Sequence, residues 1–137
     1  MIVLFDTHVV LDHLMVRKPF ENDAATLFVA AETGVIDGFL CDTTITTIHY
    51  IARKSLGKEQ TALHIGNLLA IFQIASVTPA VIRSSLGLDC ADFEDAVLHE
   101  SAVAIGAEAI VTRNARDFSC ATAPIYEPPQ LVGLLGK

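Results

Sequence analysis

Long apolar runs are missing from this 137-residue sequence, although its mean hydropathy is positive, at +0.49. The best candidate for a membrane span, residues 68–77, has about half the length that a spanning helix needs, and it contains Gln73. The N-terminus also lacks the basic segment of a signal peptide, because Met1 to Phe5 is already an apolar run that leads to Asp6. We therefore expect a cytoplasmic protein without a membrane segment.

Cysteine is scarce, and its spacing suggests no pairing. The three cysteines, Cys41, Cys90 and Cys120, are odd in number and far apart, and no C-x-x-C pair occurs. Disulfide frameworks and zinc knuckles are both recognised by characteristic cysteine spacings. The sequence therefore predicts three reduced thiols that are buried or half-buried.

Basic residues are few as well. Nine Lys and Arg residues stand against 16 Asp and Glu residues, which gives a formal net charge of −7. This balance argues against binding of nucleic acid through bulk positive charge. It leaves open an enzyme whose bound cations offset a pocket of carboxylates. Cations gather locally at Arg53, Lys54 and Lys58, and again at Arg113 and Arg116.

Repeats, low-complexity tracts and linkers are also absent, so we expect a single domain over residues 1–137. Periodicity and turn signals predict strands over residues 2–5, 38–41, 74–77, 109–112 and 124–126. They predict helices over residues 7–16, 22–32, 43–57, 58–72, 79–86, 92–105 and 129–135. Alternating strands and helices are typical of a mainly parallel sheet of four to five strands covered on both faces, a three-layer α/β/α sandwich.

One of these helices is ambiguous in sequence. The β-branched residues after Asp42 favour a strand by propensity. However, Ile45, Ile48 and Ile51 recur at helical spacing, and Asp42 can serve as an N-cap. We therefore predict a helix that ends near Gly57.

Carboxylates gather where the predicted strands end. Asp6 follows the first strand, Asp117 closely follows strand 109–112, and Asp95 lies at the start of the helix that leads into that strand. In parallel sheets, ligands bind beyond the carboxyl ends of the strands. Clustered carboxylates repel one another unless a cation compensates, and all-oxygen ligands suit Mg²⁺ or Mn²⁺. The pattern favours metal-assisted phosphoryl chemistry.

Each of these acids also has a simpler interpretation. Asp92 can be only the N-cap of its helix, with Asp95 at the third helical position, where capping and metal binding are compatible. Asp6 can be a turn residue at the end of its strand. We expect Glu94 to face solvent, and Asp12 to face solvent or to cap its helix locally.

Polar neighbours of these acids have similar alternatives. Asn114 can be an ordinary turn residue. His8 and His49 can lie near the pocket, either as second-shell groups or as partly buried packing residues. His13, His64 and His99 have no partner pattern, and we expect them to be structural or exposed.

Three segments together resemble PIN domains, the nuclease fold of many bacterial toxin–antitoxin ribonucleases. Residues 4–12 (LFDTHVVLD) are similar to the first motif of the family, residues 92–97 (DFEDAV) to the third, and residues 110–118 (IVTRNARDF) to the fourth. The resemblance spans nearly the whole chain and implies a PIN-like form of the α/β/α sandwich.

The second motif is where this sequence departs from the family. PIN nucleases usually carry a Glu in the helix after the second strand, but Thr47 occupies that position here, and no acidic residue lies between Asp42 and Glu59. His8 is a second departure, because Asn is common there. Asp42 or Glu94 could supply the missing carboxylate in space.

The resemblance implies hydrolysis of RNA by water that a bound Mg²⁺ or Mn²⁺ ion activates. Asp6, Asp95 and Asp117 would be the metal ligands, and Asn114 would position water or metal. The implied contacts to RNA phosphates are Arg113 and Arg116, together with Arg53 and Lys54, which could equally be solvated cations of their helix. The expected second shell contains His8, Thr47 and Asp92.

The leading hypothesis is a ribonuclease that acts as the toxin of a toxin–antitoxin pair, with an antitoxin partner and a homodimeric state. The loss of the second carboxylate favours an alternative, a degenerate PIN module that binds RNA or protein. A phosphoacceptor receiver domain would share an acidic pocket at the strand ends. That class normally needs a Lys after a late strand, and the sequence has none there.

Overall fold

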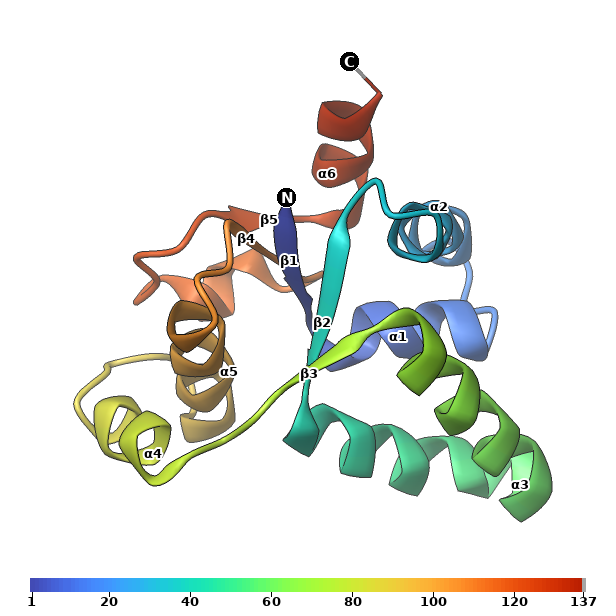
Figure 1. The fold of residues 1–137 in the computed structure, drawn as a ribbon, viewed down its shortest axis with the longest axis horizontal. Coiled ribbons are helices and arrows are strands. Elements are labelled where there is room, and N and C mark those ends of the chain that lie inside the picture. The colour runs from blue at the N-terminus through green and yellow to red at the C-terminus, as the bar shows by residue number, and fades with distance from the viewer. Residues whose placement is uncertain (137) are drawn as a thin grey trace.

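The computed structural model describes residues 1–136 and contains a five-stranded sheet with helices around it (Figure 1). The strands are β1 (Ile2–Phe5), β2 (Asp37–Cys41), β3 (Gln73–Ala75), β4 (Ala109–Val111) and β5 (Ile125–Tyr126). The helices are α1 (Thr7–Leu14), α2 (Glu21–Glu32), α3 (Asp42–Ile71), α4 (Pro79–Leu86), α5 (Phe93–Ala104), α6 (Pro128–Leu135) and the 3₁₀ turn η1 (Ala115–Phe118). The alternating α/β order predicted from sequence is confirmed.

The strands pair in the order β3-β2-β1-β4-β5, and every pair is parallel. β1 is therefore central, and its last residue, Phe5, lies beside Val111 at the end of β4. The Asp6 backbone N–H donates to Val111 O at 2.9 Å, which holds the first residue after β1 against the end of β4. This register places the segments that follow β1 and β4 next to each other.

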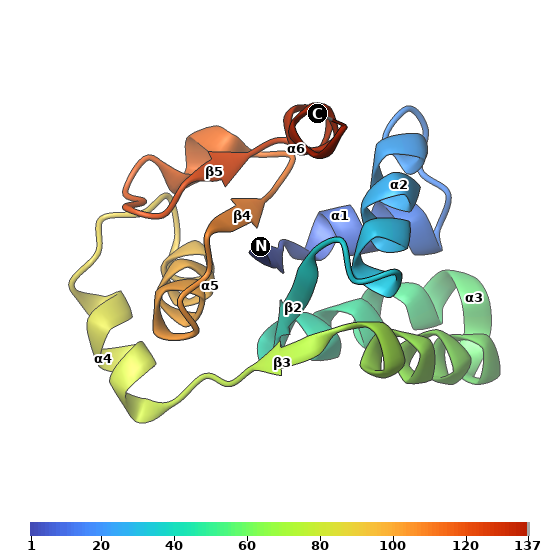
Figure 2. The ribbon, with the colours of Figure 1, turned by 45° about the horizontal axis from the view of Figure 1, so that its top comes forward.

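Successive side chains of each strand point to opposite faces of the sheet, and helices cover both faces. Val3 and Phe5 pack into one core with residues of α1, α2, α3 and α6, whereas Leu4 packs into a second core with residues of α5 and η1. Figure 2 shows α4 and α5 on the opposite side of the sheet from α1, α2 and α3. The predicted three-layer α/β/α sandwich is confirmed, because each strand contributes side chains to both faces.

The structure explains why glycine occupies two positions, 57 and 38. Gly57 adopts φ 80°, a backbone conformation that favours glycine, and it kinks α3 at the point where two separate helices were predicted. The two predicted helices are confirmed, because the non-helical backbone of Gly57 separates the two halves of α3. At Gly38 of β2, a Cβ atom would lie 2.7 Å from Cδ1 of Phe72, so the close approach of this ring excludes a side chain.

The cysteines differ from the prediction. Cys90 and Cys120 form a disulfide, with their Cα atoms 5.0 Å apart, while Cys41 is free and buried. The prediction of reduced thiols was therefore wrong for two of the three, because the fold brings together residues that are 30 positions apart. The disulfide ties the loop before α5 to the segment after η1. Among the described residues, no helix is long and apolar enough to cross a membrane.

Candidate active site, an acidic pocket at the sheet edge

A pocket of about 220 Å³ lies where the chain leaves β1 and β4. We call it the acidic pocket, and its lining residues are Asp6, Thr7, His8, Thr47, Asp92, Glu94, Asp95, Asn114 and Asp117. All four residues predicted as catalytic line it, and so do the three predicted as a second shell. The fold thus brings together residues from both ends of the sequence.

Asp6 is held in a fixed orientation. It is the N-cap of α1, and its Oδ1 accepts from the Thr7 backbone N–H at 2.7 Å. Its Oδ2 accepts from the Thr112 hydroxyl at 2.6 Å, and the same hydroxyl oxygen accepts from the Asn114 backbone N–H at 3.1 Å. Thr112 is fully buried and thereby links Asp6 to Asn114.

Sequence reasoning missed Thr112 as a member of the site. The available signal was a hydroxyl at the end of an apolar strand, two residues before Asn114. That signal is weak by itself, because a Thr at a strand end is common in any sheet. Only the pairing of β1 with β4 shows that its hydroxyl meets Asp6.

Asp92 and Asp95 begin α5 as predicted. Asp92 is the N-cap, and its Oδ1 accepts from the Asp95 backbone N–H at 2.8 Å. Burial, together with the negative charges of Asp92, Asp6 and Asp117, raises the pKa of Asp95 to about 7. The surroundings of Asp95 in the acidic pocket therefore disfavour its ionised form.

Two nearby acids, Glu94 and Asp42, are the candidates predicted to replace the missing second-motif carboxylate. Thr47 lines the acidic pocket, but its hydroxyl donates to Thr43 O at 3.1 Å and contributes no charge. Glu94 lines the same pocket while remaining exposed, which agrees with the expectation that it faces solvent. Asp42 is committed elsewhere, since its Oδ2 accepts from the Val77 backbone N–H at 3.1 Å. Glu94 is thus the candidate for the missing carboxylate.

The donor set of the acidic pocket fits a hard divalent cation. Its carboxylates and the Asn114 amide offer only oxygen ligands of the kind that Mg²⁺ and Mn²⁺ prefer. The raised pKa of Asp95 reports a repulsion that such a cation would relieve. Over residues 1–136, no three acidic, His or Cys side chains already converge at metal-ligand distances. Water molecules and substrate oxygens would therefore supply part of the coordination, as is usual for Mg²⁺.

Asp12 is a correction to the sequence prediction. It does not face solvent but is fully buried, and it lies beside two arginines. Nε of Arg113 is 2.8 Å from its Oδ2, and Nη1 of Arg17 is 3.9 Å from its Oδ1. Burial raises the pKa of Asp12, while the charges of Arg113 and Arg17 lower it. The apolar neighbours of Asp12 in the helix gave no sign of these cations, which come from distant or following segments.

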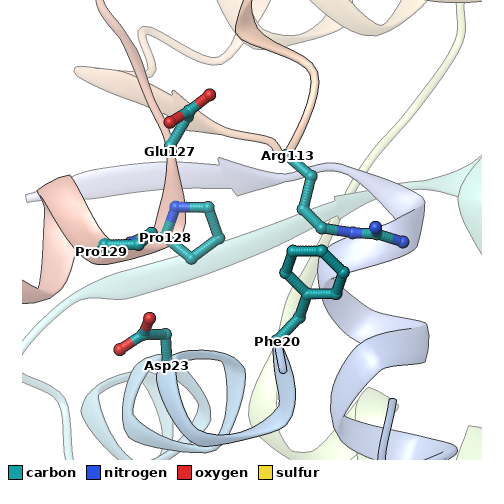
Figure 3. Close-up of a pocket in the computed structure, with 6 residues that line it drawn as sticks. All are labelled: Phe20, Asp23, Arg113, Glu127, Pro128 and Pro129. Carbon is teal, nitrogen blue, oxygen red and sulfur yellow. The ribbon is translucent and has the colours of Figure 1, made fainter. Parts of the chain in front are cut away.

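Arg113 is directed away from the acidic pocket. Its guanidinium lies 4.1 Å above the ring of Phe20, beside Pro128 and Pro129, in a separate hollow of about 160 Å³ (Figure 3). Asp23 and Glu127 complete the lining of that hollow. The structure does not bring Arg113 to the site, so its suggested contact with RNA stays a prediction.

The other predicted cations lie outside the acidic pocket. Arg53 and Lys54 line a hollow on α3 together with Thr46, His49 and Tyr50. The Lys54 ammonium donates to the Tyr50 hydroxyl at 3.0 Å. Arg116 is exposed on η1, next to Asp117. Their roles in binding RNA also stay predictions.

The histidines lie in three different settings. His8 lines the acidic pocket, and its Nδ1 is 3.3 Å from Nη1 of Arg17. His49 lines the hollow with Arg53 and not the acidic pocket. His99 is buried, and its Nε2 accepts from the Thr122 backbone N–H at 3.1 Å, which confirms a structural role.

Comparisons with known proteins agree with this architecture. A family model described as PIN domain matches residues 2–116. No curated protein matches the chain. Solved structures match it over most of its length at low sequence identity, which shows the shared fold.

Three of these structures illustrate the range. DNA-bound VapBC from Salmonella typhimurium has 16% identity and a TM-score of 0.71, over 93% of this chain and 98% of that chain. A toxin–antitoxin complex from Klebsiella pneumoniae has 20% identity and a TM-score of 0.69, over 92% and 97%. VapC20 from Mycobacterium tuberculosis, a toxin that cleaves the sarcin–ricin loop, has 10% identity and a TM-score of 0.64, over 79% and 86%.

Proposed function

The chain belongs to the PIN-domain family, and from this membership and its acidic pocket we propose that it is a metal-dependent ribonuclease that hydrolyses phosphodiester bonds of RNA. The single observation that carries the proposal is the group of carboxylates around one pocket, with the pKa of Asp95 raised to about 7. Such a group is unfavourable by itself and becomes favourable around a cation.

Asp6, Asp95 and Asp117 would hold the metal, with Glu94 in place of the second-motif acid. A bound Mg²⁺ or Mn²⁺ ion would supply a water of lowered pKa and would stabilise negative charge on the phosphodiester. The protein's own contribution is orientation. The Thr7 N–H and the Thr112 hydroxyl fix both carboxylate oxygens of Asp6, and the Asp92 cap fixes the start of α5, from which Asp95 projects.

We also propose that the protein is the toxin half of a cytoplasmic toxin–antitoxin pair. The support is that one structure with the same fold is described as a toxin–antitoxin complex and another as a toxin. An antitoxin protein would then be the partner. A homodimer is part of the same proposal, and a monomer by light scattering at micromolar concentration would contradict it.

A second candidate function is a degenerate PIN module that binds RNA or protein without cleaving it. Thr47 favours this candidate, because a neutral hydroxyl occupies the position of a carboxylate and donates to the backbone of its own helix. The two candidates predict the same fold and the same pocket. They differ in whether the pocket turns over substrate.

The deciding experiment is cleavage of a panel of structured RNAs in Mg²⁺ or Mn²⁺ by the wild type, Asp6→Ala and Asp95→Ala. Glu59→Ala is the matched control, because Glu59 is an exposed acid on α3 outside the acidic pocket. We expect both pocket variants to lose at least about 100-fold in rate, since even the partners of metal ligands contribute about 10- to 100-fold. We expect the control and the wild type to cleave equally. No cleavage by folded wild type with either metal would favour the binding module.

A further inference from the structure

Two further hollows lie near the acidic pocket along α3. The first, which we call the threonine hollow, is lined by Thr43, Thr46, Thr47, Val77, Ile82, Phe93, Glu94 and Val97. It shares Thr47 and Glu94 with the acidic pocket. The second, which we call the basic hollow, is lined by Thr46, His49, Tyr50, Arg53 and Lys54, and it shares Thr46 with the threonine hollow. Because neighbouring hollows share lining residues, the three adjoin one another, and we call them together the groove.

The helical period places four residues that line the groove on one face of α3. Thr43, Thr47, Tyr50 and Lys54 are spaced by three or four residues, so they share one face of the first half of α3. Eleven residue steps of helix span about 16 Å. Stacked nucleotides rise by about 3.4 Å along one strand, so this face is long enough for a few nucleotides.

Two aromatic rings stand exposed along the groove. Phe93 lines the threonine hollow and is 48% exposed, and Tyr50 lines the basic hollow and is 65% exposed. The Lys54 ammonium lies 4.2 Å from the centroid of the Tyr50 ring and covers one of its faces. Exposed apolar rings that lie together mark a binding surface. Every nucleobase has a flat face that can stack on an aromatic side chain.

The two cations of the basic hollow, Arg53 and Lys54, are not neutralised by a carboxylate of the described residues. Over residues 1–136, neither Arg53 nor Lys54 forms an ion pair, although acidic residues outnumber basic ones in this chain. Unpaired cations at one end and a cation-binding pocket at the other end are complementary to a chain of phosphates. A neutral protein segment would leave the two cations without counterions.

On the basis of the proposed function, we propose that this groove binds a single strand of RNA, with one base stacked on Phe93 and another on Tyr50. The backbone phosphates contact Arg53 and Lys54 at one end and reach the acidic pocket at the other. Bases paired in a duplex present their edges and not their faces to a protein, so they cannot stack on these rings. The groove therefore selects unpaired segments of RNA.

The test is binding of a fluorescein-labelled ten-nucleotide RNA of mixed sequence, followed by anisotropy, beside a duplex of the same length. Ca²⁺, a hard cation, replaces Mg²⁺ during the titration, and a gel confirms that the RNA stays intact. The variants are Tyr50→Ala, Phe93→Leu and Lys54→Gln. The matched controls are Leu63→Ala, an exposed apolar residue on the second half of α3, and Arg83→Gln, an exposed cation on α4.

We expect Tyr50→Ala and Phe93→Leu each to weaken binding of the single strand about tenfold, within the range measured for stacking of one base. Tyr50→Phe, which keeps the ring, should bind like the wild type. Lys54→Gln should reduce the salt dependence of binding by about 0.7 in logarithmic slope, the value for one phosphate contact to a single strand. Both controls should be unchanged, and the duplex should bind at least about tenfold more weakly than the single strand.

A second measurement locates the strand directly. Photocrosslinking with RNA that carries 4-thiouridine should label peptides that contain Tyr50 or Phe93. If the wild type cleaves RNA but the ring variants bind it unchanged, the groove proposal fails alone, and the rings would instead contact a protein. If the wild type neither cleaves nor binds RNA, the proposed function fails, and the groove proposal fails with it.

Discussion

Two carboxylates, the buried Asp12 and the half-buried Asp95, lie on opposite layers of this molecule and have neighbours of opposite charge. Burial raises the pKa of both. Around Asp12, the protein supplies its own cations, Arg113 and Arg17. Around Asp95, the charged neighbours that shift its pKa are further carboxylates, namely Asp92, Asp6 and Asp117. The first carboxylate has counterions within the chain, whereas the second lies among like charges.

The comparison distinguishes a carboxylate that stabilises the fold from one that prepares a binding site. A carboxylate that is paired within the protein fixes the chain, because it joins α1 to the segment after β4 that also carries Asn114. A carboxylate that is left among like charges stores an unfavourable interaction that binding can relieve. The same residue type therefore stabilises the fold at one position and prepares a site at the other.

Removing Asp12 should have the largest effect on stability. We expect Asp12→Ala to lower the free energy of unfolding by about 3 kcal/mol, because it leaves the partly buried Arg113 without a counterion. Urea denaturation measures the change, with Glu59→Ala as the control. The double variant Asp12→Leu with Arg113→Met should recover most of the loss. An unchanged stability in Asp12→Ala would remove the contrast between the two carboxylates.

Removing the disulfide should lower stability by a similar or slightly smaller amount. The bond lies close in sequence to two acids of the acidic pocket. Cys90 lies two residues before Asp92, and Cys120 lies three residues after Asp117. We expect Cys90→Ser to lower the free energy of unfolding by about 3 kcal/mol, from the chain entropy of the loop that the bond closes. Urea denaturation with and without dithiothreitol checks this. The wild type should respond to the reductant, and Cys90→Ser should not.

Changing Thr47 to Glu should sharpen the contrast by adding charge to the acidic pocket. We expect Thr47→Glu to bind Mg²⁺ or Mn²⁺ about tenfold more tightly, because ligand charge tunes the affinity of oxygen sites. The rate of RNA cleavage should rise with it. Calorimetric titration with Mn²⁺ measures the affinity, and Thr46→Glu, one position along the same helix, is the control. No change would contradict the alignment of Thr47 with the second-motif acid.

Neutralising Asp95 should change stability least, and it should stabilise the protein, whereas the changes at Asp12 and Cys90 destabilise it. A carboxyl group with a pKa raised to about 7 binds more protons in the folded than in the unfolded state, so the stability of the metal-free protein falls as pH rises from about 4 to about 7. Asp95→Asn removes this loss. We expect it to stabilise the metal-free protein at pH 8 by about 1 kcal/mol, a value limited by solvent screening.

The measurement for Asp95→Asn is a series of melting curves in chelator from pH 4 to pH 8. The gain in stability should be greatest at pH 8 and should vanish near pH 4, where the folded wild-type carboxyl is also neutral. Added Mn²⁺ should stabilise the wild type more than the variant. A gain that does not depend on pH would show that charge repulsion is not its cause.

Much of the candidate site followed from local sequence. The apolar residues of β1 end at Asp6, the cap of α5 is Asp92, and strand β4 precedes Asn114 and Asp117. Each of these positions is fixed by periodicity or by capping, which act over a few residues. The rule that sites lie beyond the carboxyl ends of parallel strands then joins them. For this reason, the acidic pocket was predictable in its main residues.

The errors share a different physical origin. The surroundings of Asp12 depend on Arg113, which is about a hundred residues away in sequence, and the disulfide joins residues 30 positions apart. The role of Thr112 in the site, which sequence reasoning missed, depends on the pairing of β1 with β4. None of these contacts leaves a local pattern. A buried Asp and an exposed Asp on a helix look alike in sequence.

The sequence by itself determined the order of strands and helices, the parallel three-layer fold and the position of the acids at the strand ends, because hydrophobic period and capping are properties of short segments. Only the tertiary structure decided which acids are neutralised within the protein and which are left facing one another. It also decided that three hollows with shared lining residues adjoin one another along α3. Burial and charge pairing are properties of the surroundings of a residue, and those surroundings come from distant parts of the chain.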